Sequence, residues 1–137
     1  MHDMAKLNQV SGRIIEGALR VHSRLGPGVF EPVYEACLEY ELGHLGMTVE
    51  RQKAIPVLYD EVRLDCGFRL DLLVEDLVVV ELKAVESLLP VHHAQLLSYL
   101  RLSGKPLGLL INFHEAHLRD GIHRKITIPP PHLREPP

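Results

Sequence analysis

The chain has 137 residues, of which 46% are hydrophobic and 24% are charged, and its formal net charge at pH 7 is −3. This length and composition fit one globular domain with a sizeable core and argue against a second domain. The negative net charge argues against a protein that grips duplex DNA over a broad basic surface, so we expect any nucleic-acid contact to be local.

The first third of the sequence predicts two helices. Apolar residues recur at three- and four-residue spacing from Leu7 to Leu25, which predicts an amphipathic helix over residues 5–24 that covers one face of a sheet. Gly26-Pro27-Gly28 ends this helix, and a second helix is predicted over residues 30–45. We expect Gly28 to serve the tight turn between the helices, because glycine adopts backbone conformations that other residues avoid.

The middle of the sequence predicts a meander of three strands. Runs rich in apolar and β-branched residues are separated by turns at Asp60-Glu61 and Glu75-Asp76. The predicted strands cover residues 54–59, 62–74 and 77–84.

The last third predicts one more helix and the remaining strands. A helix over residues 90–102 begins at Pro90 and ends at Gly104, and a buried strand follows over residues 107–113. A further short strand completes the sheet. Residues 129–137 are rich in proline and predict an extended tail, which leaves residues 1–128 as a single domain.

Asp71 and Glu81 occupy the two β-rich runs on either side of the Glu75-Asp76 turn. With a three-residue connection the two carboxylates would face each other, and with a two-residue connection they would be diagonal neighbours. Glu81 directly follows three valines, in a core strand where an unpaired charge is costly. Because side chains alternate along a strand, Glu81 and Lys83 project from the same face.

This set of two acids and one amine has two interpretations. Carboxylate oxygens on a rigid sheet suit a hard divalent cation such as Mg²⁺ or Mn²⁺, and Lys83 would then hold a hydroxide or a phosphate oxygen. The same spacing also fits an ordinary cross-strand ion pair on a solvated face. Local sequence supports both interpretations equally.

Five other residues attract attention, and each has a structural interpretation as well. Glu31 lies in the first turn of the second helix, where the helix dipole favours an acid. Tyr34, one turn on, fits a buried core position, and His22 lies on an apolar helix face, which is typical of a hydrogen-bonded core histidine. Gln95 and Tyr99 share one side of the third helix, where they either cap the sheet or face a site.

Several motifs occur together in a specific order. The segment from Gly28 to Tyr34 fits a GxxExxY pattern, and Asp71, then Glu81-Leu82-Lys83, then a QxxxY pair at Gln95 and Tyr99 follow it. In this order the motifs resemble the GxxExxY family of the PD-(D/E)XK nuclease superfamily, over residues 10–126. Leu70 stands where the superfamily's name has a proline. Segments 50–53, 69–74 and 108–113 also look like that family.

The resemblance implies an α/β, restriction-endonuclease-like fold, in which a central mixed sheet of a three-strand meander plus one or two more strands is flanked by helices. It also implies a site in which Asp71, Glu81 and the Leu82 carbonyl hold Mg²⁺ or Mn²⁺. Glu31 would complete the metal site directly or through water, with Tyr34 packed beneath it, and Lys83 would position the nucleophile.

RecB-like members of the superfamily suggest roles for the remaining candidates. Their QxxxY helix faces the carboxylates, which implies that Gln95 orients Lys83 or the substrate and that Tyr99 supports it. These enzymes also add a histidine ligand from an upstream helix, for which His22 is the candidate here.

We therefore expect a metal-dependent nuclease that hydrolyses phosphodiester bonds of nucleic acid, with DNA favoured, and a homodimer or protein partner that helps to enclose the strand. One alternative is a non-catalytic binding module that keeps the nuclease fold. Another is a phosphohydrolase acting on nucleotides or small phosphate esters, which would explain the missing basic surface. No apolar run reaches a membrane-spanning length, so we expect no membrane partner and a cytoplasmic location.

Overall fold

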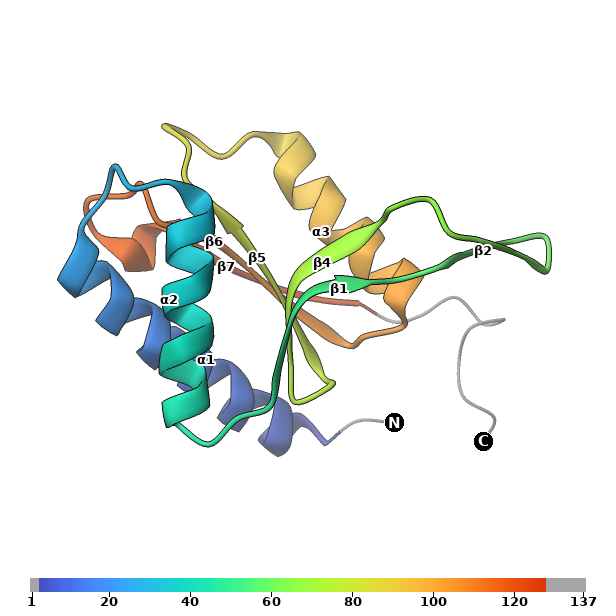
Figure 1. The fold of residues 1–137 in the computed structure, drawn as a ribbon, viewed down its shortest axis with the longest axis horizontal. Helices are drawn as coiled ribbons and strands as arrows, with labels where there is room; N and C mark the ends of the chain where they lie inside the picture. The colour runs from blue at the N-terminus through green and yellow to red at the C-terminus, as the bar shows by residue number, and fades with distance from the viewer. Residues whose placement is uncertain (1–2, 128–137) are drawn as a thin grey trace.

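A computed structural model describes residues 3–127 of the protein and shows a mixed α/β fold (Figure 1). Its central sheet has five strands in the order β1-β4-β5-β6-β7. Strands β5 and β6 are parallel, and every other neighbouring pair is antiparallel. The strands are β1 (Val49–Ala54), β4 (Arg69–Val74), β5 (Val78–Lys83), β6 (Leu107–Asn112) and β7 (Ile122–Ile126). This mixed sheet flanked by helices confirms the expected fold class.

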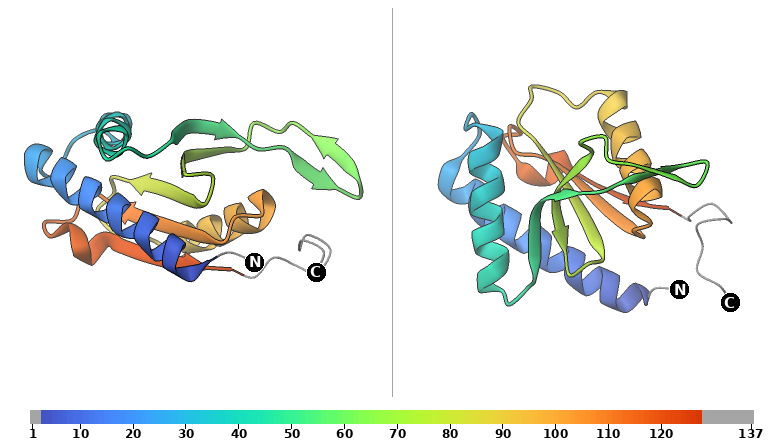
Figure 2. Two further views of the ribbon diagram at one scale, coloured as in Figure 1. Left: turned by 90° about the horizontal axis from the view of Figure 1, so that it is seen from below. Right: turned by 45° about the vertical axis from the view of Figure 1, so that its right-hand side comes forward.

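Three helices and one 3₁₀ turn cover the sheet. They are α1 (Met4–Leu25), α2 (Glu31–His44), α3 (Pro90–Ser103) and η1 (Leu118–Gly121). Figure 2 shows α1 and α2 on one side of the sheet and α3 on the other. The predicted helices are confirmed to within one residue at each end, because their apolar spacing and their glycine and proline boundaries are strong local signals.

The core consists of two apolar layers. The larger layer packs α1 and α2 on one sheet face and contains Ile14, Leu38 and Val80 among others. The smaller layer packs α3 on the opposite face through Leu96 and Leu100. Gly108 of β6 allows this approach, since a Cβ there would lie 2.7 Å from Leu96 Cδ1. Asp71 and Glu81 belong to the two strands at the centre of this arrangement.

The strand boundaries in the first half of the sheet differ from the prediction. The strand predicted over 54–59 corresponds to β2 (Val57–Tyr59), whereas β1, which ends at Ala54, was not predicted. Pro56, which cannot donate to a ladder, lies between the two strands. The strand predicted over 62–74 is two strands, β3 (Val62–Leu64) and β4, separated by a segment in which Gly67 has φ +75°. Strands β2 and β3 pair only with each other, as a separate two-stranded sheet.

Two further expectations concern the chain as a whole. The predicted proline-rich tail, residues 129–137, lies outside the described residues. Across residues 3–127, no helix has the length and apolar character needed to cross a membrane.

Candidate active site

Asp71 and Glu81 converge across β4 and β5. Residues 75–77 connect the strands, and the register pairs Leu72 with Val80, which places Asp71 opposite Glu81. The backbone N–H of Asp71 donates to Glu81 Oε1 at 3.1 Å, and the N–H of Leu82 donates to Asp71 Oδ2 at 2.9 Å. At the point where the regular backbone pairing of β4 and β5 ends, the two carboxylates therefore accept the N–H groups that backbone carbonyls would otherwise accept.

Burial makes this carboxylate pair electrostatically unfavourable when both groups are ionised. Glu81 is only 5% exposed, and burial followed by the negative charge of Asp71 raises its pKa from 4.5 to about 9. Burial also raises the pKa of Asp71, partly offset by the hydrogen bond from Leu82. A positive charge placed against both oxygens would stabilise the ionised forms.

Lys83 supplies one positive charge near the pair. Its ammonium group lowers the pKa of Asp71 and Glu81, and also that of Glu31, so it lies within electrostatic range of all three carboxylates. Its side chain is half-buried and forms no ion pair with another residue between positions 3 and 127. The amine is therefore available to a ligand.

The N-terminus of α2 brings Glu31 to the same region. Glu31 is the first residue of that helix, and burial followed by the charge of Asp71 raises its pKa. This coupling connects a residue of the first third of the chain with the strand that carries Asp71. Glu31, Asp71, Glu81 and Lys83 thus form one electrostatic cluster.

Helix α3 contributes Tyr99 to the opposite side of the cluster. The Tyr99 ring packs against Phe68 with 4.7 Å between centroids, and burial raises the pKa of its hydroxyl, with further contributions from Glu81 and Asp71. Gln95 lies one turn earlier on α3 and is half-exposed. Its amide has no side-chain hydrogen bond to any residue in the described range.

Two candidate residues make contacts elsewhere. The hydroxyl of Tyr34 donates to the Gly26 carbonyl at 2.5 Å and accepts from the Val29 N–H at 3.1 Å, which fixes the turn between α1 and α2. His22 Nε2 donates to the Glu115 carbonyl at 2.7 Å, in the loop after β6. The observed contacts of Tyr34 and His22 are thus with backbone groups and not with the carboxylates.

Glu35 is a buried acid that sequence reasoning missed. It is 4% exposed, and its Oε1 accepts from Arg51 Nε and from Gln52 Nε2, both at 2.9 Å. Gln52 of β1 has a positive φ of 53° and lies opposite Asp71 of the neighbouring strand β4. The only available signal was the spacing of Glu35 four residues after Glu31, which places both acids on one side of α2.

Asn112 is a second missed residue. It is fully buried and pairs with Lys83 across the parallel strands β5 and β6. Its Oδ1 accepts from the Val85 N–H at 3.1 Å, and its Nδ2 donates to the Val85 carbonyl at 2.9 Å. Asn112 therefore fixes the chain that leaves β5 directly after Lys83.

The donor set fits a cation that keeps much of its water. Within residues 3–127, no three His, Cys, Asp or Glu side chains already form a metal-binding group. The close pair of Asp71 and Glu81 is nevertheless what Mg²⁺ commonly uses, one or two carboxylates together with waters and substrate phosphates. Burial is the main cause of the raised pKa of both acids, and a bound cation would stabilise their ionised forms.

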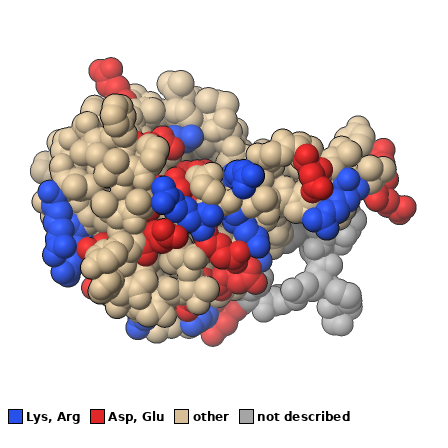
Figure 3. Space-filling view, in the orientation of Figure 1, with Lys and Arg blue, Asp and Glu red and all other residues tan. Residues whose placement is uncertain are grey.

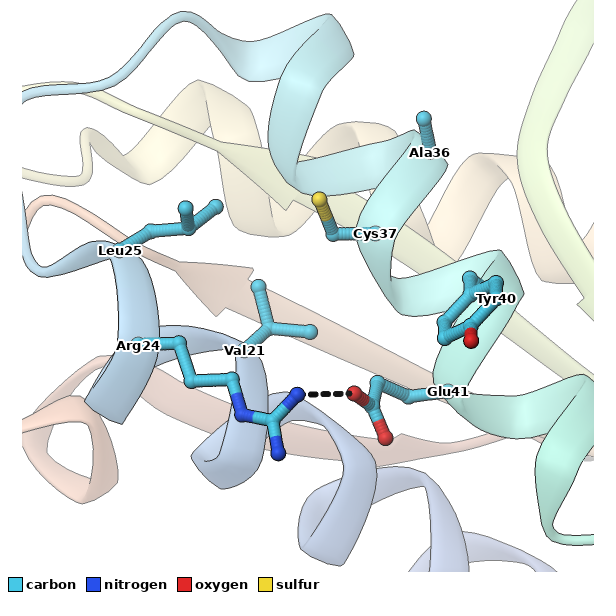
Figure 4. A pocket seen from close by; sticks show the side chains of 7 residues that line it. All are labelled: Val21, Arg24, Leu25, Ala36, Cys37, Tyr40 and Glu41. Atoms are coloured by element: carbon cyan, nitrogen blue, oxygen red, sulfur yellow. Dashed lines mark ion pairs between the residues drawn. The ribbon is translucent and has the colours of Figure 1, made fainter.

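A cavity of about 370 Å³ lies elsewhere, between α1 and α2 (Figure 4). Its lining is mostly apolar and includes Val21, Leu25, Cys37 and Tyr40. At its edge, Arg24 Nη1 lies 3.6 Å from Glu41 Oε1. None of the residues that the sequence singled out for catalysis lines this cavity, so it is separate from the carboxylate cluster.

Comparison with known proteins adds one finding to this geometry. The family model for the PD-(D/E)XK nuclease superfamily matches residues 8–125. The chain belongs to this superfamily. No curated protein and no solved structure matched it.

Membership of the PD-(D/E)XK superfamily agrees with the position of the cluster. The match spans every strand of the five-stranded sheet except the last residue of β7, and it includes Asp71 and the Glu81-Leu82-Lys83 segment. It supports a nuclease-type function in general. The fold is therefore that of a restriction-endonuclease-like domain.

Proposed function

We propose that this protein is a divalent-metal-dependent nuclease of the GxxExxY group, formed by residues 1–128 and located in the cytoplasm. The observation that carries the proposal is the pair formed by buried Glu81 and half-buried Asp71, each of which accepts a backbone N–H from the other's strand, with Lys83 in electrostatic range of both. A structural ion pair would not need a buried and a half-buried acid side by side, because one lysine cannot neutralise both.

Asp71, Glu81 and the Leu82 carbonyl would hold Mg²⁺ or Mn²⁺, with Glu31 bound directly or through water. The Leu82 N–H points toward Asp71, while the neighbouring Lys83 carbonyl accepts from the Phe113 N–H at 2.8 Å on the β6 side. Because successive strand residues direct their backbone groups to opposite edges, these bonds support a Leu82 carbonyl directed toward Asp71. The chemistry that the cation supplies is a lowered pKa of water and a positive charge beside the phosphate oxygens.

Lys83 and Gln95 would act on the substrate. The ammonium group of Lys83 donates to a phosphate oxygen or holds the attacking water, and either contact stabilises charge that grows in the transition state. The free amide of Gln95 orients Lys83 or the substrate, and Tyr99, packed on Phe68, supports that side of the site.

Nucleic acid, with DNA favoured, is the proposed substrate. The net charge of −3 limits phosphate contacts to a small area. Near the site, Arg69 is exposed, whereas Arg51 is held by Glu35 at 2.9 Å and Lys53 by Glu50 at 2.8 Å. Arg69 is thus the basic residue best placed to meet the strand.

The test is cleavage of labelled single- and double-stranded DNA and RNA with Mg²⁺ or Mn²⁺. Wild type should cleave at least one polymer, and Lys83→Ala and Asp71→Asn should cleave it at least roughly 10²-fold more slowly. Lys6→Ala, which removes an exposed lysine of α1, is the matched control and should retain full activity. Equal cleavage by wild type and Lys83→Ala would refute the mechanism, and hydrolysis of mononucleotides alone would identify a phosphohydrolase instead.

A further inference from the structure

The β2–β3 ribbon projects from the body of the molecule as an arm, which we define as residues 55–68 (Figures 1 and 2). Its two strands are joined by a tight turn in which Asp60 and Glu61 have φ values of 49° and 68°. Strands β2 and β3 pack mainly on each other and form a sheet separate from the central one. Ile55 and Phe68 anchor the arm to the smaller core layer, whereas the β2–β3 ribbon beyond them extends into solvent.

The two faces of the arm differ in chemistry. The register pairs Val57 with Leu64 and Tyr59 with Val62, so these four apolar side chains share one face. On that face Tyr59 is 67% exposed, Val62 56% and Leu64 42%. The other face pairs Leu58 with Arg63, whose guanidinium lies 3.7 Å from Asp65.

This apolar face is unusual for a surface that only contacts water. A two-stranded ribbon is marginally stable by itself, and it gains stability when its apolar face is buried against another surface. Contiguous exposed apolar side chains commonly mark an interaction site. The apolar face thus calls for an apolar partner.

The charges around the arm indicate which partner fits. Asp60 and Glu61 form the turn at the free end of the arm, where Figure 3 shows acidic side chains, whereas the exposed Arg69 lies where the arm joins the sheet. An acidic tip and an apolar face without a basic residue both disfavour contact with phosphates. Two copies of the arm packed antiparallel, however, would place the acidic tip of each copy against Arg69 of the other, because Lys53 is already paired with Glu50.

We propose that two copies of this protein associate through the apolar faces of their arms, antiparallel and related by a twofold axis. Such an interface is self-complementary, since the same surface serves both copies. Four side chains per copy place it at the small end of specific interfaces, roughly below 1,200 Å² in total. The dimer is accordingly expected to dissociate in the micromolar range.

The first test compares two arginine substitutions by sedimentation equilibrium. Tyr59→Arg introduces a charge on the apolar face and should weaken dimerisation roughly tenfold or more. Leu58→Arg changes the adjacent residue, which is similarly exposed but on the opposite face, and should leave the dimer intact. Both residues are exposed, so thermal melting should remain close to that of the wild type in each variant.

The second test examines the antiparallel arrangement. Glu61→Lys and Arg69→Glu should each weaken the dimer, because each places like charges together at tip and base. The double variant restores opposite charges and should recover most of the lost affinity. Glu61→Lys adds no backbone strain, since the replaced residue already has a positive φ.

Three results would overturn the proposal. A wild-type protein that stays monomeric in the high micromolar range would exclude association through the arm. Equal effects of Tyr59→Arg and Leu58→Arg would show that the apolar face is not the interface, and no recovery in the double variant would exclude the antiparallel arrangement. A monomer in which Tyr59→Arg weakens oligonucleotide binding would assign the arm to the substrate instead.

Discussion

Asp71 and Glu81 each accept a backbone N–H from the partner's strand, Glu81 from Asp71 and Asp71 from Leu82. The bonds orient both carboxylates before any ligand arrives. They also hold half-buried Asp71 beside buried Glu81, so the pair is organised for a cation at a cost to the stability of the free protein.

The first prediction concerns pH and stability without metal. In the folded protein the pKa of Glu81 is raised from 4.5 to about 9, so the folded state keeps a proton that the unfolded state releases. The contribution of Glu81 to the free energy of unfolding should therefore be greatest below about pH 4.5. It should fall by on the order of 1 kcal/mol per pH unit as the pH rises from about 4.5 to about 9. Urea denaturation in EDTA at several pH values measures this slope.

Glu81→Gln provides the control for that slope. The amide does not ionise, so the variant should lose most of the pH dependence and become more stable than wild type near pH 8. Raised pKa values of Asp71 and Glu31 act in the same direction and leave a residual slope. An unchanged slope in Glu81→Gln would contradict the assignment of the proton to this residue.

The second prediction concerns metal binding. A cation that binds only the folded state should stabilise wild type by RT ln(1 + L/Kd), where L is the cation concentration and Kd its dissociation constant. Mg²⁺ or Mn²⁺ should raise the melting temperature of wild type but not that of Asp71→Asn. A similar rise in both proteins would mean that the cation binds elsewhere.

The third prediction concerns catalysis. Lys83→Ala removes the amine beside the carboxylates and should lower kcat by roughly 10²–10³-fold, as expected for loss of one group that stabilises the transition state. Because Lys83 is half-buried and forms no ion pair with a described residue, the variant should keep the wild-type melting temperature. Single-turnover cleavage and thermal melting measure the two effects separately.

The fourth prediction concerns Glu35. Glu35→Ala leaves Arg51 and Gln52 without their shared acceptor and should cost about 1–3 kcal/mol of stability. It should also lower cleavage, because Gln52 lies opposite Asp71. Glu39→Ala, which removes a more exposed carboxylate 4.0 Å from the same arginine, should change neither quantity appreciably.

The fifth prediction separates Tyr34 from the catalytic residues. Tyr34→Phe removes the hydroxyl that bonds Gly26 and Val29 and should cost about 1–2 kcal/mol of stability. Cleavage at a temperature well below melting should stay near the wild-type rate. A large fall in kcat without a loss of stability would instead place Tyr34 in the site.

Local sequence was sufficient for the helices and for the convergence of the central pair. Asp71 and Glu81 belong to strands joined by the short connection 75–77, so two hairpin registers were the only alternatives, and both brought the acids together. Helices α1 and α3 are followed by the glycines Gly26 and Gly104, and the three- and four-residue spacing of their apolar residues is a short-range signal for a helix. These features depend on few residues, so the sequence alone determined them.

The rest depended on contacts between distant segments. Glu31 and Tyr99 reach the carboxylates because α2 and α3 pack on opposite faces of one sheet, which no local pattern determines. The positive φ of Gln52 and its hydrogen bond to Glu35 depend on the pairing of β1 with β4. The arm exists because Pro56 and Gly67 interrupt two runs of residues whose composition alone favours continuous strands. The amino-acid sequence by itself thus determined the helices and the chemistry of the carboxylate pair, whereas long-range packing decided the strands of the first half of the sheet, the other residues that surround the pair and the apolar surface that remains exposed.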